Sequence, residues 1–420
     1  MLDAAVNSRG FQEMSQLTAS EARRTALILA ASQAIVGSAA PISISIGALA
    51  GFYLLGADKS LATAPVTGFN VGVALGALPA AAIIKRAGQR NGFLTGTAVT
   101  AAGGALATAA MFADDFWLFA LGLLVVGIGG GFVQQFRFAA ADNAPPVFKA
   151  RAISFVLAGG VVTAILGPQI VIFTRELLAP VMFAGSFAAI IVLAAVGAVI
   201  LSFLRAPAKH STGSEVAEEP ARPLAEIVAQ PRFIVALLCS VGTFALMSFV
   251  MTGAPLAMVG CGFSTDEATL GISWHVMAMF APSFFTGRLI HRFGAETIVA
   301  TGLALLVGCA LIALSGIALW QFWSALILLG LGWNFGFIGA TAMVADTYRS
   351  SEKGKVQGIH DLVLFSSVAF ASLMSGAVYN AYGWDMLNWV VFPIVALCLG
   401  ALVVLIFSRN RAGRVVENEG

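Results

Sequence analysis

The chain has 420 residues, of which 59% are hydrophobic and only 10% are charged, and its formal net charge is +2. A soluble domain carries roughly 25% charged residues, because its surface must face water. This sequence has too little charge for such a surface, and it lacks the concentrated basic patch that a nucleic-acid partner needs. Its four cysteines have no CxxC spacing, which argues against a metal or redox cofactor. The composition therefore indicates a membrane protein without a cofactor.

Twelve apolar windows follow one another along the chain, each long enough to cross a bilayer as a helix of about 20 residues. Open sheet edges cannot exist in lipid, so runs of this length indicate helices and an all-α fold. The first window follows a polar tail, 1–24, and has no cleavage site after it, so we expect an uncleaved helix. The windows are 25–50, 61–84, 93–113, 116–140, 152–174, 180–204, 233–259, 267–290, 297–317, 320–345, 356–379 and 385–408.

The basic residues give the orientation of these spans. With the N-terminus in the cytoplasm, all of the 23 Lys and Arg residues except Lys59 and Arg175 fall on cytoplasmic segments. Both termini are therefore expected in the cytoplasm, including the tail 409–420. The polar, proline-containing segment 205–232 is the longest connection, and it predicts a cytoplasmic linker between a bundle at 25–204 and a second at 233–408.

The two predicted bundles repeat one another. Three elements recur at nearly the same spacing: Gly88 and Gly294 differ by 206 residues, Gly127 and Gly330 by 203, and Asp142 and Asp346 by 204. Each pair lies on corresponding helices of a six-plus-six arrangement. Such agreement indicates an internal repeat of one six-helix unit.

The loops at 85–90 and 287–294 resemble the loop signature G-x-L-a-D-R-x-G-R of the major facilitator superfamily. The second copy, Gly287-Arg-Leu-Ile-His291-Arg292-Phe-Gly294, fits except that His291 replaces the aspartate. The first copy keeps Arg86 and Gly88, followed by Arg90, but places Lys85 at the acidic position. The resemblance implies twelve helices as two six-helix bundles with a pseudo-twofold axis. In the family this loop latches the halves through charge pairs, so here we expect a latch that is weaker or differently wired.

Two other family patterns are incomplete, which weakens a proton-antiport interpretation. Leu123 stands where drug antiporters carry an arginine, four residues before Gly127. Gly167-Pro168 begins the helix-five antiporter element, but Val171 and Ile172 replace its paired glycines. The chain also has no phosphate-binding GxxxxGK[ST] loop, so transport should be secondary or facilitative and not driven by ATP.

Ionisable residues inside a membrane are costly, which makes each a functional candidate. No carboxylate lies at mid-membrane, and Asp142 and Asp361 are the deepest. His275 lies within a span, either as a proton carrier or as a neutral, hydrogen-bonded imidazole. Arg137 is either a snorkelling side chain or an anchor for an anion or a planar group. His360 and Asp361 suit a gate, a helix cap or a proton relay.

Polar and aromatic residues complete a predicted solute path on helices that line the central cavity in this superfamily. Besides Arg137 and His275, the path comprises Gln33, Asn70, Gln134, Gln169, Phe244, Met247, Trp274, Trp333 and Asn334. Each of these residues, taken alone, is more often an interhelical hydrogen bond or packing residue than a solute contact. A lining of aromatic and amide groups suits a neutral or weakly acidic planar solute. The predicted gating set is Lys85, Arg86, Gly88, Arg90, Gly287, His291, Arg292, Gly294, Asp142, Asp346, His360 and Asp361.

The stretches 134–142 and 332–340 resemble a proteobacterial branch of the superfamily that includes riboflavin uptake proteins. The resemblance favours uptake of a vitamin such as riboflavin across the inner membrane by alternating access. We expect a monomer whose only other partner is the lipid bilayer. Whether a proton is transported together with the solute stays open. Proton-coupled efflux of drugs or metabolites is the first alternative, and a non-transporting membrane sensor is the second. An enzyme is disfavoured, because the sequence offers no catalytic dyad or metal cluster.

Overall fold

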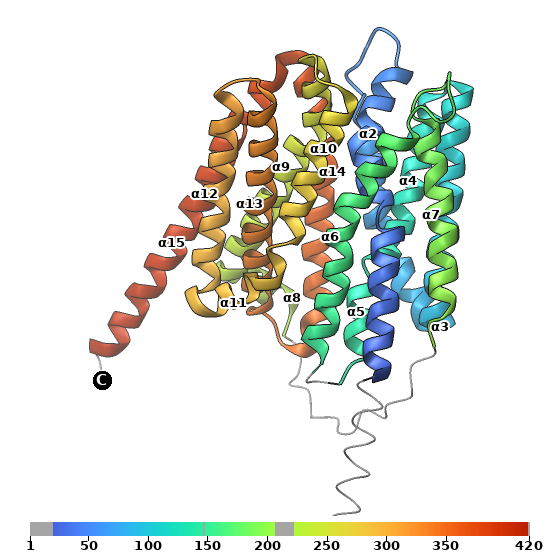
Figure 1. The fold of residues 1–420 in the computed structure, drawn as a ribbon. Helices are drawn as coiled ribbons and strands as arrows, with labels where there is room; N and C mark the ends of the chain where they lie inside the picture. The colour runs from blue at the N-terminus through green and yellow to red at the C-terminus, as the bar shows by residue number, and fades with distance from the viewer. Residues whose placement is uncertain (1–19, 146–147, 206–221, 419–420) are drawn as a thin grey trace, which may run out of the picture. The chain divides into compact units, whose positions relative to one another are not determined.

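The structure is a computed structural model that describes residues 20–145, 148–205 and 222–418. These residues form helices and their connections, without a strand among them (Figure 1). Most of the predicted tail 1–24, the end of the tail 409–420 and most of the predicted linker 205–232 lie outside the described residues. The all-α fold predicted from the composition is confirmed.

The first half of the chain contains the helices that correspond to the first six windows. Residues 20–36 are helical and are followed after a short break by α2. The remaining bounds are α2 (Ala39–Leu54), α3 (Ala64–Ala113), α4 (Phe116–Val133), α5 (Phe136–Asp142), α6 (Lys149–Thr174) and α7 (Ala184–Ser202).

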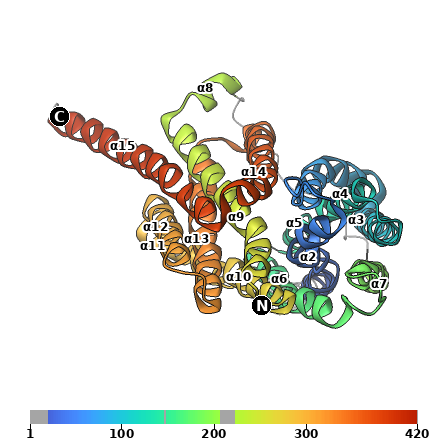
Figure 2. The ribbon, with the colours of Figure 1, turned by 90° about the horizontal axis from the view of Figure 1, so that it is seen from above.

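The second half begins with a short helix in the predicted linker and continues through the last six windows. In this half, α9 packs against both α13 and α14 (Figure 2). The bounds are α8 (Leu224–Val228), α9 (Pro231–Gly260), α10 (Thr265–Phe280), α11 (Ser283–Phe293), α12 (Ala295–Leu314), α13 (Leu319–Ala345), η1 (Ser350–Glu352), α14 (Lys353–Trp389) and α15 (Val391–Asn418).

The described helices account for the twelve predicted spans. Nine helical stretches are long and apolar enough to cross a membrane, and the bent pair α10–α11 makes ten. Two of the stretches, Ala64–Ala113 with 50 residues and Lys355–Ser408 with 54, are each twice as long as one span requires. The first breaks at Gly88 and the second near Gly383, where each glycine has a positive φ. Dividing both stretches gives the twelve spans.

The backbone forms two compact units. As far as they are described, unit 1 combines Met1–Ser43 with Gly72–Ser211, and unit 2 combines Ile44–Val71 with Thr212–Gly420. In unit 2, the Thr63 hydroxyl donates to the Leu373 carbonyl of α14 at 3.2 Å and accepts from the Gly376 N–H at 3.2 Å. The segment 44–71 thus packs on α14, whereas the predicted boundaries at 25–204 and 233–408 assign it to the first bundle. Those boundaries stay a prediction.

The internal repeat extends to the backbone conformation. Gly88 has φ 83° and ψ 162°, and its counterpart Gly294 has φ 84° and ψ 152°. Side chains other than glycine rarely adopt a φ of this kind, so both loops need glycine for the turn. Gly302 of α12 approaches the backbone of Gly336 so closely that an added methyl group would collide with it. Small residues at such crossings let membrane helices pack tightly.

The bend between α10 and α11 is held by one buried amide. The two helices meet at 43° around Pro282, which has no N–H to donate within the helix. Asn334 on α13 joins both sides of the bend: its Nδ2 donates to the Met279 carbonyl at 2.6 Å and to the Ser283 hydroxyl at 2.7 Å. Its Oδ1 accepts from the Thr286 hydroxyl at 2.6 Å. The side chain is fully buried, so these bonds fasten the bend to α13.

Replacing Asn334 by Ala should destabilise the protein, because it leaves the buried Met279 carbonyl without this partner. A buried polar group that loses its partner costs about 1–3 kcal/mol. The midpoint of thermal unfolding in detergent should therefore fall. The control T301A removes an exposed hydroxyl that bonds only its own helix at Thr297, and it should match the wild type. Equal midpoints for N334A and the wild type would contradict a role for Asn334 in holding the bend.

Ion pairs fasten the helix ends and the end of the linker within unit 2. Arg232 at the start of α9 bonds Glu296 of α12 at 2.6 Å and Asp346 at the end of α13 at 2.8 Å. Arg222 forms two parallel bonds to Glu352, Nε to Oε1 at 2.9 Å and Nη2 to Oε2 at 2.8 Å. Planar bidentate pairs of this kind are the strongest that arginine makes with a carboxylate. The part of the predicted linker that starts at Arg222 is therefore anchored to unit 2.

The bonds from Arg222 hold the pKa of Glu352 at about 2, below its ordinary value of 4.5. A group whose pKa is lowered by folding stabilises the fold fully above its unfolded pKa, and this contribution is lost as the pH falls through the folded pKa. We therefore expect E352Q to lower the midpoint of thermal unfolding at pH 7, and the difference from the wild type to narrow from pH 4.5 toward pH 2. The exposed Glu226 of α8 gives the control E226Q. A difference that does not change with pH would contradict the pair.

Candidate functional site

Four aromatic side chains from three helices of unit 2 form one cluster. Phe244 of α9 lies edge-on to Trp333, Phe337 and Phe365, with ring centroids 5.4, 5.1 and 6.3 Å away. Trp333 and Phe337, one turn apart on α13, are stacked at 5.2 Å with an interplanar angle of 17°. We call Phe244, Trp333, Phe337 and Phe365 the aromatic cluster. Its flat faces and edges are suited to holding another planar ring system.

The aromatic cluster also contains an unused donor. The indole Nε1 of Trp333 is buried and has no hydrogen-bond partner in the described part of the chain. Trp333 as a whole is 9% exposed, whereas Phe244, Phe337 and Phe365 are half-buried. Burying an N–H without a partner costs about 1–3 kcal/mol. A solute with a ring carbonyl would satisfy this donor while stacking on the neighbouring rings.

A polar group lies one helical turn from the aromatic cluster on two of its helices. Ser240 precedes Phe244 by four residues on α9, and Asp361 precedes Phe365 by four on α14. Between them, His360 places Nε2 2.9 Å from the Ser240 hydroxyl and Nδ1 3.0 Å from Asp361 Oδ1. The imidazole is 5% exposed, whereas the carboxylate is 58% exposed. The buried imidazole therefore links α9 to a carboxylate that solvent reaches.

His360 finds hydrogen-bond partners whether it is neutral or charged. In the neutral ring, Nδ1–H donates to Asp361 and Nε2 accepts from the Ser240 hydroxyl. In the protonated ring, Nε2–H donates to the Ser240 oxygen, whose own hydrogen then donates to the Leu237 carbonyl at 3.0 Å. Neither form leaves a buried group unpaired. The hydrogen-bond geometry is therefore compatible with either form of the ring.

The other predicted residues of unit 2 separate into buried and exposed ones. Trp274 is 42% exposed, whereas its neighbour His275 is fully buried. His275 Nδ1 lies 2.8 Å from the Leu326 carbonyl, which makes Nδ1 the protonated nitrogen, and Nε2 has no partner among the described residues. Met247 is 2% exposed and belongs to the core, and Asn334 is committed to the α10–α11 bend. Neither Met247 nor Asn334 belongs to the aromatic cluster.

The predicted residues of the first half are spread over separate helices. Gln33 and Gln169 are half-buried, and Gln134 and Arg137 are exposed. Arg137 lies over the ring of its neighbour Phe138 at 4.8 Å. Asn70 is in unit 2, where its Nδ2 is buried without a partner among the described residues. This portion of the predicted solute path stays a prediction.

The predicted gating residues of the two loops are mostly exposed. Lys85, Arg86, Gly88, Arg90 and Asp142 of unit 1 are exposed, as are Gly287, His291, Arg292, Gly294 and Asp346 of unit 2. Asp346 pairs with Arg232, which the sequence interpretation overlooked. In unit 1 the neutral pair Asn143 Nδ2 to Gln89 Oε1, at 2.7 Å, joins the end of α5 to the loop at Gly88. These contacts lie within each unit, so the expectation of a latch between the halves that is weaker or differently wired stays a prediction.

Sequence reasoning found two members of the aromatic cluster, Phe244 and Trp333, but missed the other two, Phe337 and Phe365. It also missed Ser240, which contacts His360. A signal for them was present. On α9, α13 and α14 an aromatic residue lies four positions after Ser240, Trp333 or Asp361, a spacing that puts both side chains on one helix face. The same spacing recurs often in apolar helices, so it could not identify these residues alone.

Comparison with known proteins assigns the fold to a family. A profile of the Major Facilitator Superfamily matches residues 25–338 and 262–420. The riboflavin transporter RfnT of Brucella anthropi is 50% identical over 394 residues, 94% of this chain and 98% of that protein. The uncharacterized MFS-type transporter YddS of Bacillus subtilis is 29% identical over 92% of each chain.

A solved structure agrees with this assignment. The xylose transporter XylE of E. coli, in a partially occluded inward-open conformation, matches 92% of this chain and 98% of its own with a TM-score of 0.68. At 13% identity this likeness concerns the fold alone. Fold, family profile and curated relatives agree, and the chain belongs to the major facilitator superfamily of membrane transporters.

Proposed function

We propose that this transporter imports riboflavin, or a vitamin with a closely similar planar ring system, by alternating access. The aromatic cluster of Phe244, Trp333, Phe337 and Phe365 is the observation that carries the proposal. Half the residues are shared with RfnT over nearly the full length of both chains, which supports the same class of solute. An isoalloxazine ring is planar, stacks on aromatic faces and has carbonyl oxygens that accept hydrogen bonds.

In this proposal the ring of the solute lies against Phe244 and the stacked pair Trp333–Phe337. A ring carbonyl accepts from Trp333 Nε1, which has no partner in the described structure. The polar side chains of Ser240 on α9 and of His360 and Asp361 on α14 face the hydroxylated chain of the vitamin. Hydroxyl and carboxylate groups are suitable hydrogen-bond partners for such a chain. Stacking supplies most of the affinity, and the polar groups orient the solute.

The direction is inward, and the chain lies in the inner membrane with both termini in the cytoplasm. The distribution of basic residues supports this orientation, because cytoplasmic loops of membrane proteins are rich in Lys and Arg. We further propose that a proton accompanies the solute and that His360 carries it, beside Asp361. The two fully hydrogen-bonded forms of His360 support this assignment.

The F244A variant removes the ring that contacts the other three members of the aromatic cluster. It should raise the KM for riboflavin by about 5- to 30-fold, since loss of an aromatic contact costs roughly 1–2 kcal/mol. W333F keeps a ring but removes the donor, and it should raise the KM about 5-fold, the equivalent of one hydrogen bond. Initial rates of labelled riboflavin uptake into a riboflavin-auxotrophic, uptake-deficient strain measure both. F370A, at a residue of α14 that is 65% exposed, is the matched control.

The same strain separates import from export. Wild-type protein should restore growth on low riboflavin and accumulate the label. Failure to restore growth, together with raised resistance to hydrophobic drugs, would replace the proposal with efflux. If uptake is intact and the KM is unchanged in both F244A and W333F, riboflavin is the transported solute but does not bind at the aromatic cluster.

The coupling proton is tested by changing the carboxylate and the imidazole. In proteoliposomes, an inward proton gradient should accelerate riboflavin uptake by the wild type. H360Q and D361N should lose this acceleration while retaining exchange of labelled for unlabelled riboflavin, which requires no net proton movement. The control E226Q changes an exposed carboxylate of α8 and should leave the acceleration intact. Gradient-driven uptake that survives in H360Q would contradict the assignment.

A further inference from the structure

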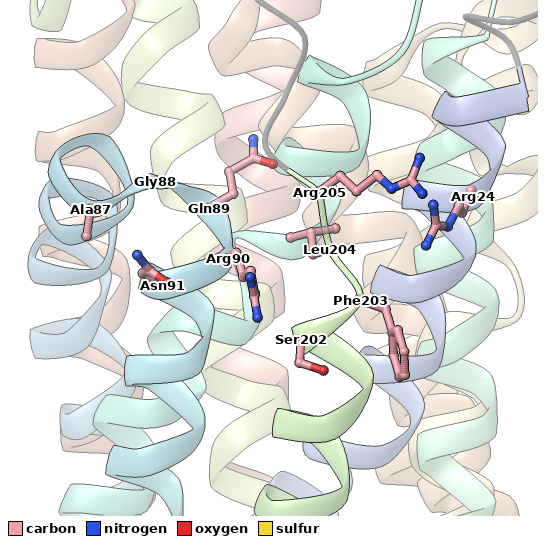
Figure 3. A pocket seen from close by; sticks show the side chains of 10 residues that line it. All are labelled: Arg24, Ala87, Gly88, Gln89, Arg90, Asn91, Ser202, Phe203, Leu204 and Arg205. Carbon is pink, nitrogen blue, oxygen red and sulfur yellow. The ribbon is translucent and has the colours of Figure 1, made fainter.

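A basic cavity in unit 1 is not used by the proposed transport site. It has a volume of about 500 Å³ and lies where three elements meet. Arg24 enters it from helix 20–36, Arg90 from α3 just after the kink at Gly88, and Arg205 from the end of α7 (Figure 3). Its other lining residues are Ala87, Gly88, Gln89, Asn91, Ser202, Phe203 and Leu204, so no lining residue is acidic.

The three guanidinium groups have no carboxylate partner within the described residues. All three side chains are exposed, and the structure gives none of them an ion pair there. Glu21 lies one turn before Arg24 on the same helix but does not pair with it in the described contacts. Three like charges around one cavity repel one another, and an anion between them would relieve this repulsion. Guanidinium groups also match the geometry of phosphate oxygens, which they bind with two parallel hydrogen bonds.

The repeat provides an internal comparison for this cavity. Counting 206 residues from Arg90, the spacing of the two kinked glycines, leads to Glu296 in unit 2. Glu296 accepts a bond from Arg232 at 2.6 Å, so an arginine at this place in unit 2 has its anion within the chain. Unit 1 carries a third cation, Arg90, where unit 2 carries that carboxylate. Unit 1 keeps Asp142, the counterpart of Asp346, but it lacks the carboxylate that Glu296 supplies in unit 2.

The side of the cavity next to α7 is apolar and exposed. Phe203, at the end of this membrane-spanning helix, has 60% of its surface exposed, and it lies beside Arg205 in the lining. A ligand that fits both features has an anionic head and an apolar body. Phospholipids have this chemistry, and basic pockets at the ends of membrane helices bind their phosphate groups.

We propose that the phosphate of an anionic membrane phospholipid occupies this cavity. Its negative charge pairs with the arginines of unit 1, as the carboxylate of Glu296 pairs with Arg232 in unit 2. The headgroup accepts hydrogen bonds from Arg24, Arg90 and Arg205, and the amides of Gln89 and Asn91 can supply further donors. The acyl chains run along α7 past Phe203. Bound lipid then fixes the kink at Gly88 to the ends of two neighbouring helices.

The test uses the full-length protein purified in detergent, with thermal unfolding and native mass spectrometry as readouts. Dioleoyl phosphatidylglycerol should raise the unfolding midpoint more than phosphatidylcholine at equal concentration, and one molecule should stay bound in the mass spectrum. Replacing Arg90 by Gln should weaken phosphatidylglycerol binding about 5-fold, the contribution of one basic residue near a lipid surface. R292Q removes an exposed arginine of unit 2 and should bind as the wild type does.

A charge reversal makes the test sharper. R90E places a carboxylate where unit 2 has Glu296, so the variant should be as stable without lipid as the wild type is with it, and its response to phosphatidylglycerol should disappear. A response in R90E equal to that of the wild type would overturn the proposal. So would an equal effect of phosphatidylcholine. A third result would be that inorganic phosphate stabilises the wild type as strongly as the lipid does and competes with it for binding. That result would overturn the proposal of a lipid and identify the ligand as a soluble anion.

Discussion

Backbone polar groups inside a bilayer have no water to bind, and this constraint determines how the helices of the protein can bend. A carbonyl freed by a break in a membrane helix must find a donor within the protein. At the α10–α11 bend, Asn334 provides that donor from α13. Near the break after residue 36, the Gln33 carbonyl keeps its bond from the Gly37 N–H and accepts a second one, at 2.8 Å, from the Thr163 hydroxyl of α6. Each bend is thereby tied to a neighbouring helix, so the bends are fixed features of the fold.

The two units use the same backbone but hold their helix ends with different chemistry. In unit 2 a charged network, Arg232 with Glu296 and Asp346, joins three helices. In unit 1 the contact between the end of α5 and the loop at Gly88 is the uncharged pair Gln89–Asn143. Charged networks are strong and sensitive to pH and salt, whereas amide pairs are weaker and insensitive to both. The repeat thus gives both units the same backbone conformation at these loops, and the side chains of each unit determine how strongly its helix ends are held together.

Much of the fold could be predicted from the sequence, because the bilayer imposes helix length and excludes charge. The twelve spans follow from these rules, and the repeat predicted the paired loops at Gly88 and Gly294, whereas the backbone conformation of these glycines is seen only in the structure. The candidate site was less accessible. A membrane helix that is apolar on all sides gives no periodic signal for its inward face, so Phe244 and Trp333 were found while Phe337 and Phe365 were not. His275 attracted attention as an ionisable residue, but its Nδ1 is bound to the Leu326 carbonyl, and His360 has the more versatile surroundings. Contacts across helices decide such questions, and a single sequence does not contain them.

The bonds between Arg222 and Glu352 also mark the point at which the chain after the predicted linker is held in unit 2. Leu204 is buried in unit 1 and Arg222 is bonded in unit 2, so each end of the predicted linker is held by its own unit, whereas the chain also passes between the units at 43–44 and 71–72. The entropic cost of closing a loop grows slowly, by about 0.6 kcal/mol for each doubling of its length. An insertion between Leu204 and Arg222, for example of a tag, should therefore cost little and leave the contacts of both residues in place. Shortening the chain past Arg222 would instead break the anchor itself.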